Sequence, residues 1–287
     1  MTTQSKMILT SVWRKWLVEN LQQGCTQAAL VEAMMQNNFS YSSAVAYIAE
    51  VAAAHAINIA SDKPVASGNF IYEGSRIAQG NTIQLTDQKV NVSLRVDQPD
   101  IVVVDNFLTT EECETLIALS KVKLERSEVI DPVTGESVII HERSSEGCYF
   151  QREEDEFIKK LDTRISELMN WPVENGEGIQ ILHYSLGGEY RPHFDYFPVE
   201  QTGSTQHIAT GGQRVATLVM YLNNVESGGE TIFPEVGLKV VPRQGSAVYF
   251  SYCNSLGQID PATLHGGEPI ITGDKWIATK WMRQNSY

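Results

Sequence analysis

The sequence predicts an α+β protein, in which a small N-terminal helical bundle precedes a sandwich or jelly roll of short strands with supporting helices. Three observations carry this prediction. Apolar residues recur at helical spacing near the N-terminus, a polar segment over 61–68 follows, and from residue 179 short β-type segments alternate with Gly and Pro. We therefore expect two domains, a bundle over 1–68 and a larger domain over 69–287.

The bundle is predicted from three amphipathic stretches. In the first, Val12, Trp13, Trp16, Leu17 and Leu21 share one helical face. Turns at 24–26 and 37–38 bracket a second stretch, and the Ala-rich residues 42–54 form a third. These stripes favour core packing, and three short helices that pack in this way make a small bundle.

The larger domain is predicted to mix strands and helices. Thr109 or Thr110 is a sound helix N-cap, followed by Glu111 and Glu112, and this helix runs towards Lys121. A second helical period covers 157–170. The predicted strands are Ile101–Val104, Ile179–Tyr184, Val215–Leu222, Leu238–Val241, Ala247–Phe250 and Lys275–Trp281.

Composition excludes several classes of function. The 287 residues carry a net charge of −13, which argues against nucleic-acid binding and against docking on anionic lipid. No signal-peptide layout is present, and the longest apolar run, 51–60, is too short to span a bilayer. The four cysteines are scattered, without a CxxC pair, which favours reduced thiols and a cytoplasmic location. Nothing in the sequence fixes an oligomeric state.

A candidate metal site begins at His193-Phe194-Asp195. In an extended strand the side chains of residues i and i+2 point to the same face, so His193 and Asp195 can converge on one ion. His265 is the candidate third ligand. Two imidazoles and one carboxylate form the facial triad of non-haem Fe(II) oxygenases, although an HxD motif with a distant His also fits surface histidines or a structural zinc site.

Lys275 favours the oxygenase interpretation. It lies ten residues after His265 and follows a predicted tight turn at 270–274, so we expect it to start the neighbouring antiparallel strand. There it shares one face with Ile277, Thr279 and Trp281. A buried ammonium is costly unless an anion pairs with it, and a dicarboxylic cosubstrate supplies that anion. A surface lysine on an edge strand is the alternative.

Several motifs, in order, resemble those of prolyl 4-hydroxylases. Residues 184–197 (YSLGGEYRPHFDYF) are similar to the HxD segment of that family. The others are 212–223 (GQRVATLVMYLN), 228–234 (GGETIFP), 264–269 (LHGGEP), 275–282 (KWIATKWM) and 102–113 (VVVDNFLTTEEC). The resemblance covers about residues 102–282 and leaves the bundle outside it.

The resemblance implies a double-stranded β-helix (jelly roll) with supporting helices, and a dioxygenase that uses Fe(II), 2-oxoglutarate and O₂. His193, Asp195 and His265 match the iron ligands, Lys275 the partner of the 2-oxoglutarate carboxylate, and Tyr184 a tyrosine near the same cosubstrate. The implied reaction is hydroxylation at C4 of a prolyl residue, coupled to decarboxylation of 2-oxoglutarate to succinate and CO₂. Ascorbate dependence is also implied. Related halogenases lack the carboxylate ligand, so Asp195 favours hydroxylation.

The substrate is the most open question. Arg214, Arg283 and Trp281 lie where the resemblance places substrate-facing side chains, but an Arg serves a peptide and a free amino acid equally well. A proline-containing peptide or protein is the expected substrate. The alternatives are a free amino acid or another small molecule, or a non-enzymatic metal-binding or interaction protein, which Lys275 and Tyr184 disfavour.

Three further features concern the surroundings of the site. The Gly-rich segment between Asp195 and Arg214 is expected to be a flexible polar loop, either a lid or an ordinary connection, with a solvated His207. Residues 131–135 are predicted to form a hairpin tip and a second candidate lid. His183 points away from Tyr184 and is interpreted as structural.

Overall fold

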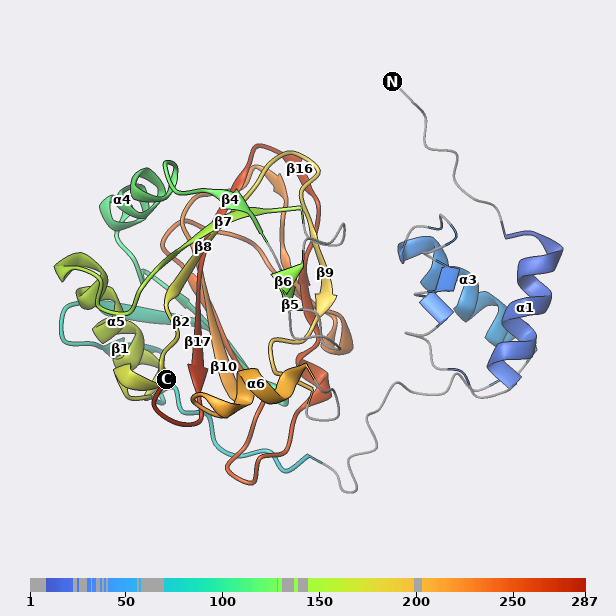
Figure 1. Cartoon of the computed structure of the whole chain (residues 1–287), viewed down its shortest axis with the longest axis horizontal. Helices are drawn as coiled ribbons and strands as arrows, with labels where there is room; N and C mark the ends of the chain where they lie inside the picture. Colours follow the sequence, from blue (N-terminus) through green and yellow to red (C-terminus); the bar gives the residue numbers. More distant parts are fainter. Residues whose placement is uncertain are drawn as a thin grey trace. The chain divides into compact units, whose positions relative to one another are not determined.

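The computed structural model describes residues 9–22, 25, 30–31, 33–34, 37, 39, 41–55, 57, 70–127, 129–130, 137–138, 144–198 and 203–287. The chain separates into two compact units, Met1–Ser67 and Gly68–Tyr287. The division falls one residue before the predicted boundary. Figure 1 shows the helices of the first unit and the sheets of the second.

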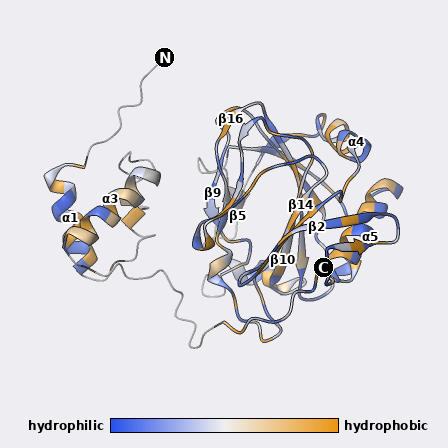
Figure 2. Cartoon of the chain, turned by 180° about the vertical axis from the view of Figure 1, so that it is seen from behind, coloured by the Kyte–Doolittle hydropathy of each residue, from blue (hydrophilic) through white to orange (hydrophobic). Residues whose placement is uncertain are grey.

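The N-terminal unit has its own apolar core. Helix α1 (Ser11–Gln22) buries Leu17 and Leu21, and α3 (Tyr41–Ala54) contributes Ile48 and Val51. Figure 2 shows hydrophobic and hydrophilic residues alternating along α1, as expected of an amphipathic helix. The predicted middle helix falls largely outside the described residues, although Leu30, Val31 and Met34 are helical and buried.

A nine-stranded antiparallel sheet forms the frame of the larger unit. Its strand order is β1-β2-β3-β14-β10-β17-β8-β7-β4. The bounds are β1 Thr82–Gln84, β2 Lys89–Asp97, β3 Asp100–Asp105, β4 Glu125–Arg126, β7 Glu146–Phe150, β8 Ile179–Tyr184, β10 Arg214–Tyr221, β14 Ala247–Ser251 and β17 Lys275–Arg283. The central strands β10, β14 and β17 are almost wholly buried, which accounts for the mainly apolar sequences of β10 and β14, whereas β17 also buries Lys275, Lys280 and Arg283.

A four-stranded sheet packs against this frame and carries two of the candidate ligands. Its order is β13-β12-β15-β9, with β9 Tyr190–His193, β12 Thr231–Phe233, β13 Leu238–Val240 and β15 His265–Gly267. The ring of Phe233 on β12 lies 5.2 Å from that of Phe250 on β14, which joins the two layers. A two-stranded ladder of β11 (Ser227–Gly228) and β16 (Ile270–Thr272) adjoins them, with a short 3-10 turn, η2, at Pro234–Val236.

One predicted strand neighbour is wrong. Lys275 does start a strand, but β17 pairs with β10 and β8, whereas the preceding strand β16 pairs with β11. The turn at Gly273, whose φ is +87°, therefore passes the chain from one sheet to the other instead of closing a hairpin. Lys275 consequently approaches the candidate site from the sheet opposite His265.

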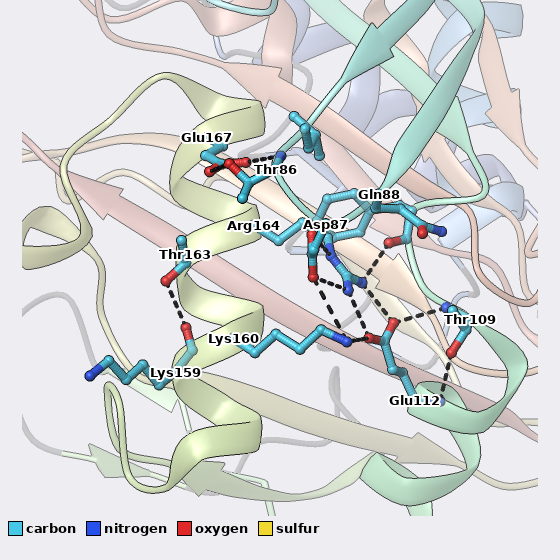
Figure 3. Close-up of polar contacts among 12 residues, drawn as sticks. Thr86, Asp87, Gln88, Thr109, Glu112, Lys159, Lys160, Thr163, Arg164 and Glu167 are labelled. Carbon is cyan, nitrogen blue, oxygen red and sulfur yellow. Dashed lines mark hydrogen bonds and ion pairs between the residues drawn. The ribbon is translucent and has the colours of Figure 1, made fainter.

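Two helices cover the frame and are tied together by buried charges. Helix α4 (Thr110–Ser120) starts with a capping box between Thr109 and Glu112, and α5 (Glu156–Met169) is capped by Asp155. Figure 3 shows Arg164 of α5 between Asp87 and Glu112, which its guanidinium contacts at 2.6–2.9 Å. Burial raises the pKa of Glu112, but hydrogen bonds from Arg164 and Lys160 outweigh this and lower it to about 2.

The segment after Asp195 differs from its prediction. It contains a short helix, α6 (Ser204–Ala209), where the sequence predicted a polar loop, and His207 is half-buried and stacked on Phe197 at 5.3 Å. Residues 199–202 of this segment lie outside the described residues, and its role as a lid stays a prediction. The ends of this segment are joined by Gln213, whose side chain bonds both the amide and the carbonyl of Phe197. An isolated polar loop would lack these contacts.

Other expectations meet the structure only in part. Strands β5 (Val129–Ile130) and β6 (Ser137–Val138) pair as a hairpin, and its predicted tip lies outside the described residues. The four cysteines are free thiols, and the cytoplasmic location stays a prediction. No described helix has the length and hydrophobicity needed to traverse a bilayer.

Candidate metal centre and cosubstrate pocket

The structure brings His193, Asp195 and His265 together. His193 ends β9 and His265 begins β15, and the two residues are directly paired across these antiparallel strands. Asp195 lies in a bend just after β9, so the extended segment assumed from the sequence ends at His193. Phe194 is turned outward, which leaves the flanking side chains on the same side.

The donor atoms of the three residues converge. Nε2 of His193 lies 3.6 Å from Oδ1 of Asp195, and Nε2 of His265 lies 3.4 Å from Oδ2. Each Nδ1 contacts a backbone carbonyl two residues earlier, that of Arg191 at 2.8 Å and that of Thr263 at 3.0 Å. These bonds fix the ring orientation and direct both Nε2 atoms at one point, as in histidines that bind metals.

The electrostatics suit a cation. Burial and the neighbouring His265 lower the pKa of His193, which favours the neutral imidazole that binds metal. Burial raises the pKa of Asp195, but the charges and hydrogen bonds of His265 and His193 outweigh it and hold that pKa well below its usual range. The triad therefore offers two imidazole nitrogens and one carboxylate.

Sequence reasoning missed the residues that hold Asp195. The hydroxyl of Thr217 on β10 donates to Oδ2 of Asp195 at 2.6 Å, and the hydroxyl of Tyr252 lies 3.1 Å from that of Thr217. Both residues are buried. A threonine within the apolar run 215–222 was the available signal, because a buried hydroxyl needs a partner.

Lys275 is buried in the space between the two sheets. Its exposed fraction is 3%, and a methyl group placed on Gly267 of β15 would lie 3.7 Å from its Nζ. Burial lowers the pKa of Lys275 to about 8, against the opposing charge of Glu230. Among the residues that the structure describes, none forms a hydrogen bond or salt bridge with this ammonium.

Two tyrosines flank the ammonium. Tyr184 is paired with Lys275 across β8 and β17, and the ring centres of Tyr184 and Tyr221 each lie 5.8 Å from Nζ. The hydroxyl of Tyr221 donates to Thr231 on β12 at 2.8 Å. His183, on the other face of β8, stacks on Trp276 and contacts Asp274, consistent with a structural role.

The candidate substrate residues form one aromatic and ionic cluster. Arg214 is held by Glu177 in a bidentate ion pair, and its guanidinium lies 4.0 Å from the ring centre of Trp281. Arg283 is 2% exposed and donates to the carbonyls of His207, Thr210 and Gly212 at the end of α6. Arg214 also reaches the carbonyl of Asp195 at 3.4 Å. Contact of the cluster with substrate stays a prediction.

The site fits Fe(II) and 2-oxoglutarate on two observations. The candidate donor atoms of His193, Asp195 and His265 all lie within 4.8 Å of one another, and among the described residues these three form the one such group of His, Cys, Asp or Glu side chains. Such a set of two imidazoles and one carboxylate leaves coordination positions open. The buried ammonium of Lys275 then suits a carboxylate, because no described residue forms a hydrogen bond or salt bridge with it.

Comparison with known proteins agrees with this chemistry. Residues 179–283 match the 2OG-Fe(II) oxygenase superfamily. Probable prolyl 4-hydroxylase 10 of Arabidopsis thaliana is 41% identical over 209 residues, which cover 66% of this chain and 71% of the relative. The chain belongs to the prolyl 4-hydroxylase family. Prolyl 4-hydroxylase 5 of the same plant is 40% identical, with 66% and 70% covered.

A solved member of this family shares the fold. The viral collagen prolyl hydroxylase of Paramecium Bursaria Chlorella virus-1, in its 2OG complex, is 29% identical with a TM-score of 0.51, and 64% of this chain and 95% of that one are covered. The predicted jelly roll with supporting helices is thereby confirmed. The chain is a dioxygenase with Fe(II), 2-oxoglutarate and O₂ as its cofactor and cosubstrates.

Proposed function

We propose that this dioxygenase hydroxylates C4 of prolyl residues in a peptide or protein. The observation that carries the proposal is a His-Asp-His triad that faces, across the two sheets, a buried ammonium that forms no hydrogen bond or salt bridge with any described residue. When bound, Fe(II) and 2-oxoglutarate supply the oxidation, in which O₂ yields one oxygen atom to the C–H bond and one to succinate, with release of CO₂.

The residues of the chain have separate tasks in this reaction. His193, Asp195 and His265 hold the metal, and Lys275 pairs with the far carboxylate of 2-oxoglutarate, with Tyr184 beside it. Thr217 keeps the carboxylate of Asp195 in place. The buried walls exclude water, which strengthens the pairing of Lys275 with an anion.

A prolyl substrate suits the aromatic surroundings of the triad. The ring of Tyr190 stacks on His193 at 3.7 Å, and Trp281, flanked by Arg214, is nearly buried. Aromatic faces pack well against a pyrrolidine ring, and an Arg can donate to the carbonyls of an extended peptide. A prolyl residue within a peptide offers its ring to the aromatic faces and the neighbouring backbone carbonyls to an Arg, which is consistent with a peptide or protein substrate. Dependence on ascorbate is part of the proposal.

We predict that the purified protein adds one oxygen atom to a proline-rich peptide only with Fe(II), O₂ and 2-oxoglutarate, and forms succinate in step. Tandem mass spectrometry locates the modified residue, and chromatography of the hydrolysed peptide separates 4- from 3-hydroxyproline. The matched control is the same peptide with alanine for proline. Turnover of free L-proline with an inert peptide would support the small-molecule alternative instead.

In cells, proteins from strains with and without the gene should differ in hydroxyproline. The same mass-spectrometric search identifies the natural substrate, because peptides modified only in the strain with the gene mark its targets. An unchanged set of hydroxylated prolines would contradict a protein substrate.

We further predict that the N-terminal unit is dispensable for the chemistry. It carries no described ligand cluster, and its apolar core is separate from that of the larger unit. A protein that starts near Phe70 should fold, bind Fe(II) and decarboxylate 2-oxoglutarate like the full chain, with changes confined to solubility, oligomeric state or affinity for a macromolecular substrate. A soluble, folded truncation unable to bind the metal would place the bundle within the catalytic domain.

A further inference from the structure

The loop that leads to His265 is built around a buried acid. Asp260 is 1% exposed and caps a short 3-10 turn, η3 (Pro261–Thr263), by accepting from the amide of Ala262 at 2.9 Å. Its carbonyl accepts the hydroxyl of Thr263 at 2.7 Å. The next strand, β15, begins with His265. Asp260 thus organises the last turn before the third ligand.

That turn positions the carbonyl oxygen of Thr263. The carbonyl of Thr263 is the group that lies 3.0 Å from Nδ1 of His265. This contact fixes the ring so that Nε2 faces Asp195, and the orientation of a metal-binding histidine depends on such a bond. The position of the Thr263 carbonyl is set by the conformation of η3, and hence by the cap.

A second path links Asp260 to Asp195. The amide of Asp260 donates to the carbonyl of Tyr252 at 2.9 Å, and the hydroxyl of Tyr252 lies 3.1 Å from Thr217, the donor to Asp195. The backbone of Asp260 thus joins this turn to the residues beside Asp195, whereas its carboxyl group caps the turn before His265.

Hydrogen bonds from the first residues of the larger unit, Ile71–Glu73, hold the loop over residues 254–260. Ile71 exchanges hydrogen bonds with Gln258 and Asn254, Glu73 accepts from the amide and hydroxyl of Ser255, and the hydroxyl of Tyr72 lies 3.4 Å from Oδ1 of Asp260. We call Ile71–Glu73 the strap. It restrains the loop from about 180 residues away in sequence.

The buried surroundings of Asp260 disfavour a charged carboxyl group. Oδ2 of Asp260 is buried and has no hydrogen-bond partner among the described residues, and burial raises the pKa of this carboxyl. An unsatisfied buried oxygen is destabilising. An apolar side chain at this position would avoid the free-energy cost of burying a carboxyl group. A role in holding the turn accounts for the presence of the carboxyl group.

We propose that Asp260 is a positioning residue for the metal centre, which orients His265 through η3 and the carbonyl of Thr263, while the strap keeps the loop in place. The inference rests on the proposed role of His265 as a ligand. Asp260 touches neither metal nor substrate. It acts through the residues between.

The test is the affinity of the metal-free protein for Co(II), a surrogate for Fe(II), measured by calorimetry and by the Co(II) absorption spectrum. Loss of an outer support of a metal ligand typically weakens metal affinity about 10- to 100-fold, and we expect that loss for Asp260→Ala. Asp260→Asn should recover most of the affinity, because an amide oxygen also caps.

The matched control is Asp155→Ala, which removes the cap of α5, where Asp155 accepts from the amide of Ile158 at 2.8 Å. It should lower the melting temperature and leave Co(II) affinity unchanged. Equal Co(II) affinity and spectrum in Asp260→Ala and wild type would overturn the inference, as would an equal loss in Asp155→Ala. If Asp260→Ala does not fold, the test passes to Asp260→Asn and Tyr72→Phe. Wild-type Co(II) affinity in Asp260→Asn together with weakened Co(II) affinity in Tyr72→Phe supports the inference. Wild-type Co(II) affinity in Tyr72→Phe contradicts it.

His265→Ala separates this inference from the proposed function. If that variant keeps the Co(II) affinity and spectrum of the wild type, the ligand assignment itself fails. If it loses them while Asp260→Ala does not, only the positioning role fails.

Discussion

Alanine at any of the three triad positions, His193→Ala, Asp195→Ala or His265→Ala, is expected to abolish turnover of 2-oxoglutarate. Among the residues that the structure describes, three side chains converge at this site, so each substitution removes a third of that ligand set. Asp195→Ala should be the most severe, because it removes the negative charge that offsets the cation and leaves the hydroxyl of Thr217 without its acceptor. Succinate formation and metal content after dialysis are the measurements.

The fold should survive these changes. His193 and His265 lie at the ends of short strands and Asp195 lies in a bend, so no substitution interrupts a strand, and removing Asp195 also removes a buried charge. Circular dichroism and melting temperature check this point, and His55→Ala in the N-terminal unit serves as a histidine control. Turnover like that of the wild type in two of the three variants is the result that contradicts the triad.

Lys275→Ala is expected to act through the cosubstrate. Removing one partner of a buried charge pair costs ~2–5 kcal/mol, which raises the KM for 2-oxoglutarate by roughly one to three decades. The kcat at saturating 2-oxoglutarate should change less, since Lys275 contacts no triad residue. Lys239→Ala is the control, because Lys239 is an exposed lysine paired with Glu268. An unchanged KM for 2-oxoglutarate in Lys275→Ala would contradict the pairing of Lys275 with the cosubstrate carboxylate.

The same lysine predicts a pH dependence of cosubstrate binding. Burial lowers the pKa of Lys275 to about 8, so the ammonium is charged below that pH and increasingly neutral above it. A dicarboxylate binds the charged form, so the affinity for 2-oxoglutarate should fall as pH rises through about 8, and the bound anion should raise this pKa. Lys275→Met should have weak affinity without this pH step. A step that persists in Lys275→Met would come from another group.

Some of the fold was predictable because its signals are local. The capping box at Thr109 and the helical period of α5 depend on residues within a few positions of each other, and both predictions are confirmed. The strands β3 and β10 were recognisable from nearly continuous apolar runs, since both of their faces are covered. Short strands such as β9 and β15 were not, because three or four residues carry little periodicity.

By itself, the sequence determined the chemical identity of this protein: the donor types in HxD and His265, the lysine that follows, and the ordered motifs of the family. Side-chain chemistry and spacing are properties of the chain before it folds. The tertiary structure alone decided that Lys275 approaches from the sheet opposite His265, that Thr217 holds Asp195, and that Asp260 sets the turn before His265. These contacts join residues that are far apart in the sequence, and backbone hydrogen bonding alone would allow their strands to pair with many others. Only packing of the two layers selects among those pairings, because burying one face of each strand fixes its neighbours and register.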